Sequence, residues 1–491
     1  MSTRRLPRSL LAVTLCGVLA AGLCGAQGVQ AGVTAREDGA SGIGDPYWPL
    51  DGNGGIDVAS YRIHNRYALA TKRLSGRTTV SFTATATADL SSFSLDFLLP
   101  VRKVTVDGVR ARFSRSGRGH ELRITPSRAL PPGSTHTAVV TYAGNPAKQD
   151  YAGERNWLAS TREVVTMNQP HMAPWWFPAN DHPLDKAIVD VRITVPKGRE
   201  VVSNGKLRGR QTGRRGTTWH WRAAEPMAPY MVVLAIGEFD LRAYEADGIQ
   251  FWDALDPDLS TPLPAQPDQP ALPPPGVTAQ ASLARQPEVI GFLAGIFGPY
   301  PFSSGGGIVD DPAELSAALE TQTRPIYASR FFADPIGGDL VVVHELAHQW
   351  AGDLVRLAGW QHLWLNEGFA TYAEWLWLER EGLVTVQQQF DVVMSDLLPA
   401  DDPFWTVLPG DPGPDTLFSG AVHLRGALTL HGLRQAVGDD DFFRILRTWI
   451  SSRAGTAVTT ADFVALAEQE SGRDLDALFQ TWLYTAGKPA T

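Results

Sequence analysis

The sequence predicts a multidomain protein: an all-β, sandwich-like domain over residues 56–242, then a mainly helical α+β domain over residues 243–491. Two observations carry this prediction. Apolar residues alternate with period two in the first part, and they recur at helical spacing in the second. The length of 491 residues is sufficient for two or three domains.

The first domain contains strand patterns and no long helical pattern. Residues 78–84 and 94–97 alternate small or polar with apolar side chains, and residues 104–109 read as a strand, a tight turn and a strand. This composition indicates an all-β sandwich. We expect this domain to form a wall of the functional site and not to carry its chemistry.

The second domain begins near residue 243, and a proline-rich stretch over residues 261–276 reads as a surface loop or spacer. Beyond it, residues 280–297 carry apolar side chains at helical spacing and stop at Gly298-Pro299. The other predicted elements are short strands at 305–310 and 315–320, and helices at 424–450 and 461–486.

The N-terminus has the features of an export signal. Arg4, Arg5 and Arg8 precede an apolar stretch, and small residues suit cleavage after Ala31. We therefore expect a signal peptide over residues 1–31, a flexible segment over 32–55 and a secreted, extracellular protein. A membrane anchor is the alternative, and the arginine pair leaves the twin-arginine route open.

The cysteine content and the net charge exclude some kinds of metal site and some kinds of binding partner. Cys16 and Cys24 both lie in the predicted signal, so the mature chain would have neither disulfides nor thiolate metal ligands. The net charge of −9 argues against nucleic-acid or anionic-membrane partners. We expect a monomer with no membrane contact after signal cleavage.

An H-E-x-x-H pattern lies in the apolar run 341–350, with histidines at His344 and His348 and an acid at Glu345. Residues four apart share one helix face, so the two imidazoles can bind one ion while Glu345 reaches the same side. Asp339 is positioned to cap this helix. Two histidines satisfied within a core are the structural alternative.

A second acidic residue supports the metal interpretation. Glu367 follows His348 after eighteen intervening residues and lies among apolar neighbours, so it is not a typical surface charge. Two histidines and one glutamate are a known catalytic zinc set, with water in the fourth position. The sequence therefore predicts a hydrolytic zinc site.

Residues 166–181 are unusually rich in aromatic residues and proline, and they include Gln169. Such a loop packs against another element, and an interdomain contact is the simplest explanation.

The chain resembles the aminopeptidase N family of zinc metallopeptidases, which are related to leukotriene hydrolases. The resemblance runs from about residue 56 to the end. It rests on the segments 344–350 and 366–370, on Ala317-Ala318-Leu319-Glu320-Thr321 in place of the family's Gly-x-Met-Glu-Asn strand, and on the ending at 479–484. It implies a thermolysin-like catalytic domain and a short secreted bacterial form without the large C-terminal helical domain of many relatives.

The resemblance also implies residue roles. His344, His348 and Glu367 would hold one zinc ion, and Glu345 would be the general base. Glu320 would bind the free α-amino group of a peptide, with Gln169 assisting. The substrate backbone would run along residues 315–320, where Ala318 lies, and Thr371 could support a ligand.

Two departures from the family pattern leave other functions open. His423 stands where the family has a tyrosine that donates to the oxyanion, and Ala317 replaces the motif's glycine. An imidazole N–H can donate, so His423 is a candidate catalytic residue. The leading hypothesis is a zinc aminopeptidase. The alternatives are a catalytically weak, zinc-bearing peptide-binding protein and a thermolysin-type endopeptidase.

Overall fold

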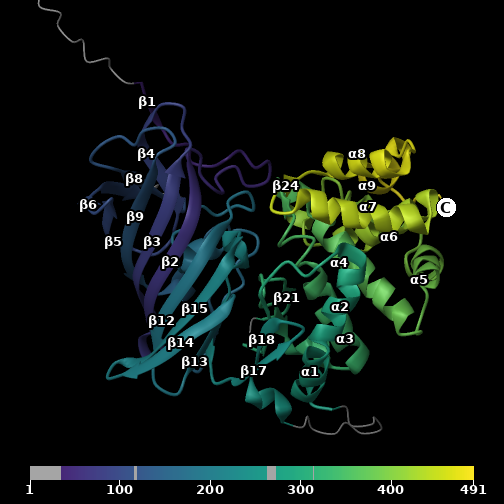
Figure 1. The fold of residues 1–491 in the computed structure, drawn as a ribbon, viewed down its shortest axis with the longest axis horizontal. Helices are drawn as coiled ribbons and strands as arrows, with labels where there is room; N and C mark the ends of the chain where they lie inside the picture. Colours follow the sequence, from purple (N-terminus) through teal and green to yellow (C-terminus); the bar gives the residue numbers. More distant parts are fainter. Residues whose placement is uncertain (1–34, 116–118, 262–272, 313–314, 491) are drawn as a thin grey trace, which may run out of the picture. The chain divides into compact units, whose positions relative to one another are not determined.

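The fold is described from a computed structural model over residues 35–115, 119–261, 273–312 and 315–490 (Figure 1). The residues from Arg36 onward form one compact unit. The predicted signal peptide and most of the proline-rich stretch lie outside the described residues. No helix in the described ranges combines the length and apolarity needed to cross a membrane.

The first half of the chain forms β-sheets, drawn in purple to teal in Figure 1. The largest is eight-stranded, and β2 lies near its middle, pairing antiparallel with β3 and parallel with β12. Its strands, in spatial order, are β14 (Lys206–Gly213), β15 (Gly216–Met227), β12 (Ala187–Val195), β2 (Ile56–Ala68), β3 (Arg73–Ala84), β9 (Thr135–Gly144), β5 (Val101–Val106) and β6 (Val109–Arg110).

Two four-stranded sheets complete the β-rich part. One is β1 (Arg36–Asp38), β4 (Asp89–Asp96), β8 (Glu121–Thr125) and β7 (Arg112–Arg115); the other is β10 (Leu158–Ala159), β11 (Val164–Val165), β16 (Leu234–Gly237) and β13 (Glu200–Ser203). Alternate residues of β3 are buried, and Phe82 packs on Phe93 of β4 with ring centroids 4.7 Å apart. This contact between two sheets is that of a sandwich.

The segment over 32–55 was expected to be flexible, but its described part packs into the β-rich domain. β1 pairs with β4, and Asp51 and Asn53 are each only 1 % exposed. Asp51 Oδ2 lies 2.5 Å from Nδ1 of His171, and Asn53 donates to Asp96. Asp51 and Asn53 of this segment therefore make buried polar contacts.

A mixed six-stranded sheet precedes the helices. Its order is β17 (Asp240–Ala246), β18 (Ile249–Leu255), β20 (Ile308–Asp310), β22 (Ile326–Ala328) and β21 (Ala318–Leu319), with β19 (Ser304–Gly305) also on β18. The expected domain boundary at residue 242 falls inside β17, and the domain division stays a prediction. Within the described residues β21 is an edge strand, which leaves one side of its backbone free to pair.

The second half is mainly helical, drawn in green to yellow in Figure 1. The expected helices at 424–450 and 461–486 are each two helices, because Gly438 (φ 85°) and Gly472 (φ 66°) interrupt them. The helices are α1 (Pro275–Ala284), α2 (Gln286–Phe297), α3 (Pro335–Ala347), α4 (Trp364–Arg380), α5 (Val386–Val392), α6 (Gly420–Val437), α7 (Asp439–Arg453), α8 (Thr460–Ser471) and α9 (Asp476–Tyr484). Two short parallel strands also pair in this half: β23 (Arg356–Leu357), which precedes α4, and β24 (Ala457–Val458), which lies between α7 and α8.

The helix that carries the motif, α3, begins earlier than expected. Its N-cap is Asp334, whose carboxylate accepts the backbone N–H of Gly337 at 2.9 Å. Asp339, the expected cap, instead pairs with Arg285. Pro335 suits the first helical position, because its fixed φ matches the helix and its missing N–H would have no partner there.

Candidate active site

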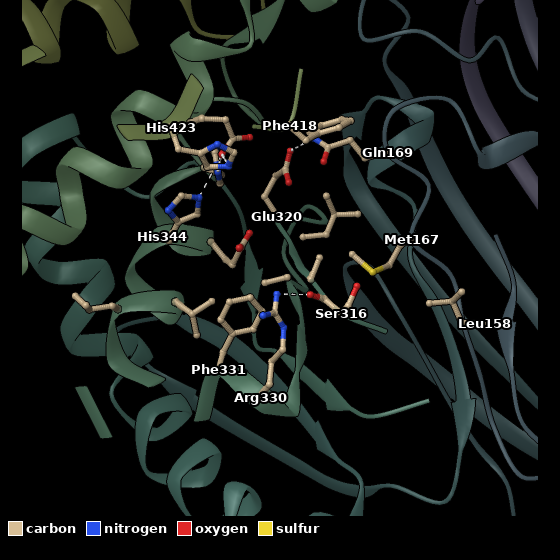
Figure 2. Close-up of a pocket in the computed structure, with 18 of the residues that line it drawn as sticks. Leu158, Met167, Gln169, Ser316, Glu320, Arg330, Phe331, His344, Phe418 and His423 are labelled. Atoms are coloured by element: carbon tan, nitrogen blue, oxygen red, sulfur yellow. Dashed lines mark hydrogen bonds and ion pairs between the residues drawn. The ribbon is translucent and has the colours of Figure 1, made fainter. Parts of the chain in front are cut away.

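A cavity of about 780 Å³ brings together the residues that the sequence singled out. Figure 2 shows it, with Gln169 and Met167 from the β-rich part on one side and His344 and His423 on the other. Its lining includes Gln169, Ala317, Ala318, Glu320, His344, Glu345, His348, Glu367, Glu374 and His423.

The three predicted metal ligands converge. Nε2 of His344 lies 3.3 Å from Oε2 of Glu367, and Nε2 of His348 lies 3.4 Å from the same oxygen. On a tetrahedral zinc with bonds of about 2.0–2.2 Å, neighbouring ligand atoms lie about 3.3–3.5 Å apart. Each imidazole nitrogen therefore lies at the distance from the carboxylate oxygen that two ligands of one zinc ion require.

The outer nitrogen of each imidazole is held by an acceptor. Nδ1 of His344 lies 2.6 Å from Oε1 of Glu374, and Nδ1 of His348 donates to the carbonyl of Ala351 at 3.1 Å. Such partners turn the free Nε2 lone pairs toward a metal. Sequence reasoning missed Glu374, although it stands two turns after Glu367 on α4. Thr371 is buried there, but its hydroxyl makes no hydrogen bond among the residues described.

Glu345 is 5 % exposed and lies beside the metal ligands. Burial raises the pKa of its carboxyl to about 8, although His344 and His348 act in the opposite direction. A nearby dication would lower this pKa again. A carboxylate in this position, beside the two imidazoles, is suited to act as a general base.

Glu320, just after β21, is buried at 2 % exposure, and desolvation is the largest cause that raises its pKa. Gln169 Nε2 donates to Oε1 of Glu320 at 3.1 Å, and the two side chains point toward each other in Figure 2. Oxygen atoms of Glu320 and Glu345 and a ring nitrogen of His348 lie within 4.8 Å of one another. A ligand with a positive group would offset the cost of burying this carboxylate.

The strand leading to Glu320 lines the cavity. Ala317 and Ala318 both face it, and Ala317 is exposed. β21 pairs with β22 on one side, through Ala318 and Leu319. An extended chain in the cavity could therefore pair with its other edge. Gln349 fixes this strand to the metal helix, since its side chain donates to the carbonyl of Glu320 at 3.2 Å.

His423, on α6, reaches the metal ligands. Its Nε2 lies 3.1 Å from Oε2 of Glu367, and its Nδ1 donates to the carbonyl of Ser419 at 3.1 Å. Although burial opposes the change, His423 and His348 hold the pKa of Glu367 well below its usual range. The contact to Ser419 could not be foreseen without the helix boundary.

Comparison with known families agrees with this geometry. The Peptidase M1 N-terminal domain matches residues 58–231, and the Peptidase family M1 domain matches residues 338–482. The chain belongs to peptidase family M1. The predicted family and fold class are thereby confirmed: a β-rich domain is followed by a mainly helical domain.

Two relatives with similar sequences match parts of this chain. Aminopeptidase M1-A of Oryza sativa subsp. japonica is 26 % identical over 66 % of this chain and 37 % of its own length. Aminopeptidase N of Streptomyces lividans is 33 % identical over 30 % of this chain and 18 % of its own. The chain thus spans less than half the length of these relatives.

Solved structures of M1 zinc metallopeptidases cover almost the whole fold. The enzyme of Deinococcus radiodurans superposes with a TM-score of 0.75 at 27 % identity, over 91 % of this chain and 98 % of that chain. A mutant two-domain M1 zinc metallopeptidase bound to L-tryptophan gives a TM-score of 0.77 at 27 % identity, over 91 % and 99 % of the two chains.

Proposed function

We propose that this M1 peptidase is a zinc aminopeptidase that removes N-terminal residues from peptides. His344, His348 and Glu367 hold one zinc ion. The observation that carries the proposal is the position of Glu320, whose buried carboxylate lies within 4.8 Å of ligand atoms of Glu345 and His348. We infer that an amino group bound there would bring the first peptide bond of the substrate to Glu345 and the metal ligands.

A zinc ion held by His344, His348 and Glu367 would supply Lewis-acid chemistry, which polarises a carbonyl group and makes water a stronger nucleophile near neutral pH. Glu345 accepts a proton from the attacking water and passes it to the leaving amine. Its carboxylate can perform both transfers because it lies inside the cavity and beside His344 and His348.

Glu320 binds the free α-amino group, and Gln169 holds one carboxylate oxygen of Glu320 in place. The backbone of the peptide lies along β21 and pairs with the strand at Ala318. Ala317 adds a methyl group to the cavity wall where the family motif has glycine, which brings the strand's surface closer to the substrate.

Hydrolysis of matched peptides with free and N-acetylated termini tests the proposal. The mature, zinc-loaded protein should cleave the free peptide at its first bond and leave the blocked peptide intact. Equal cleavage of both, or cleavage at internal bonds, would instead indicate the thermolysin-type endopeptidase.

A second candidate function is a zinc-bearing peptide-binding protein of low activity. His423 favours it, because this residue replaces the tyrosine expected as an oxyanion donor, and loss of one such donor lowers turnover about 10²–10³-fold. The variant His423→Tyr separates the two functions. A large rise in turnover supports the weak enzyme, whereas a fall shows that His423 itself takes part in catalysis.

We also propose that the protein is exported, that residues 1–31 are removed, and that the mature form is monomeric. The basic start followed by an apolar stretch supports export. N-terminal sequencing of protein recovered from culture medium tests the cleavage position, and light scattering tests the monomer.

A further inference from the structure

Three imidazoles, and not two, point at the same carboxylate oxygen. Oε2 of Glu367 lies 3.3 Å from Nε2 of His344, 3.4 Å from Nε2 of His348 and 3.1 Å from Nε2 of His423. Figure 2 shows the rings of His344 and His423 turned toward one point of the cavity, and the two rings are nearly parallel, with centroids 6.0 Å apart.

The hydrogen bond made by Nδ1 of His423 decides which nitrogen of its ring can bind a metal. Nδ1 faces the carbonyl oxygen of Ser419 at 3.1 Å, and a carbonyl can only accept, so Nδ1 carries the hydrogen. In the neutral ring Nε2 then has a free lone pair. His348 is arranged in the same way, with Nδ1 on the carbonyl of Ala351. This is the usual arrangement of a metal-binding histidine.

Backbone packing places His423 beside Glu367. α4 and α6 touch at Gly368 and Gly426, where a Cβ atom on either glycine would lie 2.8 Å from the backbone of the other. Gly368 directly follows Glu367, and Gly426 stands one turn after His423. The close approach of the two helices therefore sets the spacing of the backbones that carry the imidazole and the carboxylate.

We propose that His423 is a fourth protein ligand of the zinc ion in the substrate-free enzyme. The inference rests on the zinc site proposed above. The distance of 3.1 Å from Nε2 to Oε2 is close to the edge of a zinc tetrahedron, as are the two distances that define the site. A doubly protonated ring at this position would instead repel the cation.

A fourth protein ligand would occupy the position at which a substrate reaches the zinc ion. Catalytic zinc sites keep an open position, whereas sites with four protein ligands are closed, although zinc can expand to five ligands. The side chain of His423 is 31 % exposed, against 13 % for His344 and 1 % for His348. It is therefore the imidazole with room to move aside when a peptide enters.

X-ray absorption spectroscopy of the zinc-loaded mature protein tests the assignment, because scattering from imidazole rings counts the histidines on the metal. We expect three imidazoles in the wild type and two in His423→Phe. The matched control is His431→Gln on the same helix, where we expect three. Two imidazoles in the wild type, or no loss in His423→Phe, would overturn the proposal.

Binding of acetohydroxamate, a small zinc ligand, gives a second readout that does not depend on turnover. It should bind more tightly to His423→Phe, because the imidazole no longer competes for the metal; unchanged or weaker binding would contradict the proposal. The aminopeptidase proposal fails separately, through cleavage of N-blocked peptides. Circular dichroism of each variant checks that the fold is retained.

Discussion

Replacing Glu320 by glutamine removes one negative charge from the cavity without changing the shape of the side chain. The carboxylate is 2 % exposed and its Oε1 is held by Gln169 at 3.1 Å, so a bound ammonium group would pair with it away from water. Breaking a buried ion pair costs about 3–5 kcal/mol. At about 1.4 kcal/mol per factor of ten, kcat/KM for free peptides should fall by roughly 10²-fold to a few thousand-fold.

The assay compares a panel of aminoacyl p-nitroanilides with their N-acetylated forms. The preference for free over blocked substrates should collapse in Glu320→Gln. The stability of the protein should not fall, because burial raises the pKa of Glu320 and the neutral amide avoids that desolvation. Glu225→Gln, which removes a carboxylate outside the cavity, is the control. Retained selectivity for free termini would refute the assignment.

Three further substitutions test other parts of the site and fold. Glu345→Gln should lower kcat by about 10²–10⁴-fold with zinc content unchanged, and near-normal turnover would exclude it as the base. Glu374→Ala removes the 2.6 Å partner of His344 and should weaken zinc binding about 10–100-fold in chelator competition; equal affinity would show that this contact does not orient the ring. Burial, followed by Glu163, raises the pKa of Asp310 from 3.8 to about 8. Because the folded-state pKa is the higher one, ionisation destabilises the wild type as pH rises from about 4 to 8, so Asp310→Asn should gain in relative Tm over that range and then level off. A Tm difference that does not change with pH would contradict a raised pKa at Asp310.

The helix that carries the metal ligands could be predicted from sequence, because the pattern that defines it lies within a few neighbouring residues. Two histidines four residues apart within an apolar run specify one helix face, and this face alone brings His344 and His348 together. Glu367 was found by composition, since an acid among apolar neighbours is unusual. Its convergence on the same point depends on how α3 and α4 pack, which no periodicity encodes.

Features that depend on tertiary contacts could not be predicted. Asp334 and Asp339 are both acceptable caps from sequence; in the structure Asp334 is the cap, and Asp339 lies inside the helix and pairs with Arg285. Glu374 reads as an ordinary surface acid until its partner His344 is placed. The role of the Gly368–Gly426 contact is visible only when two helices distant in sequence are side by side.

The metal content of the purified mature protein tests the central claim most directly. Elemental analysis should find one zinc ion per chain in the wild type and almost none in His348→Ala or Glu367→Ala. Wild-type protein that binds no zinc under zinc-replete conditions, or variants that retain it in full, would contradict the account.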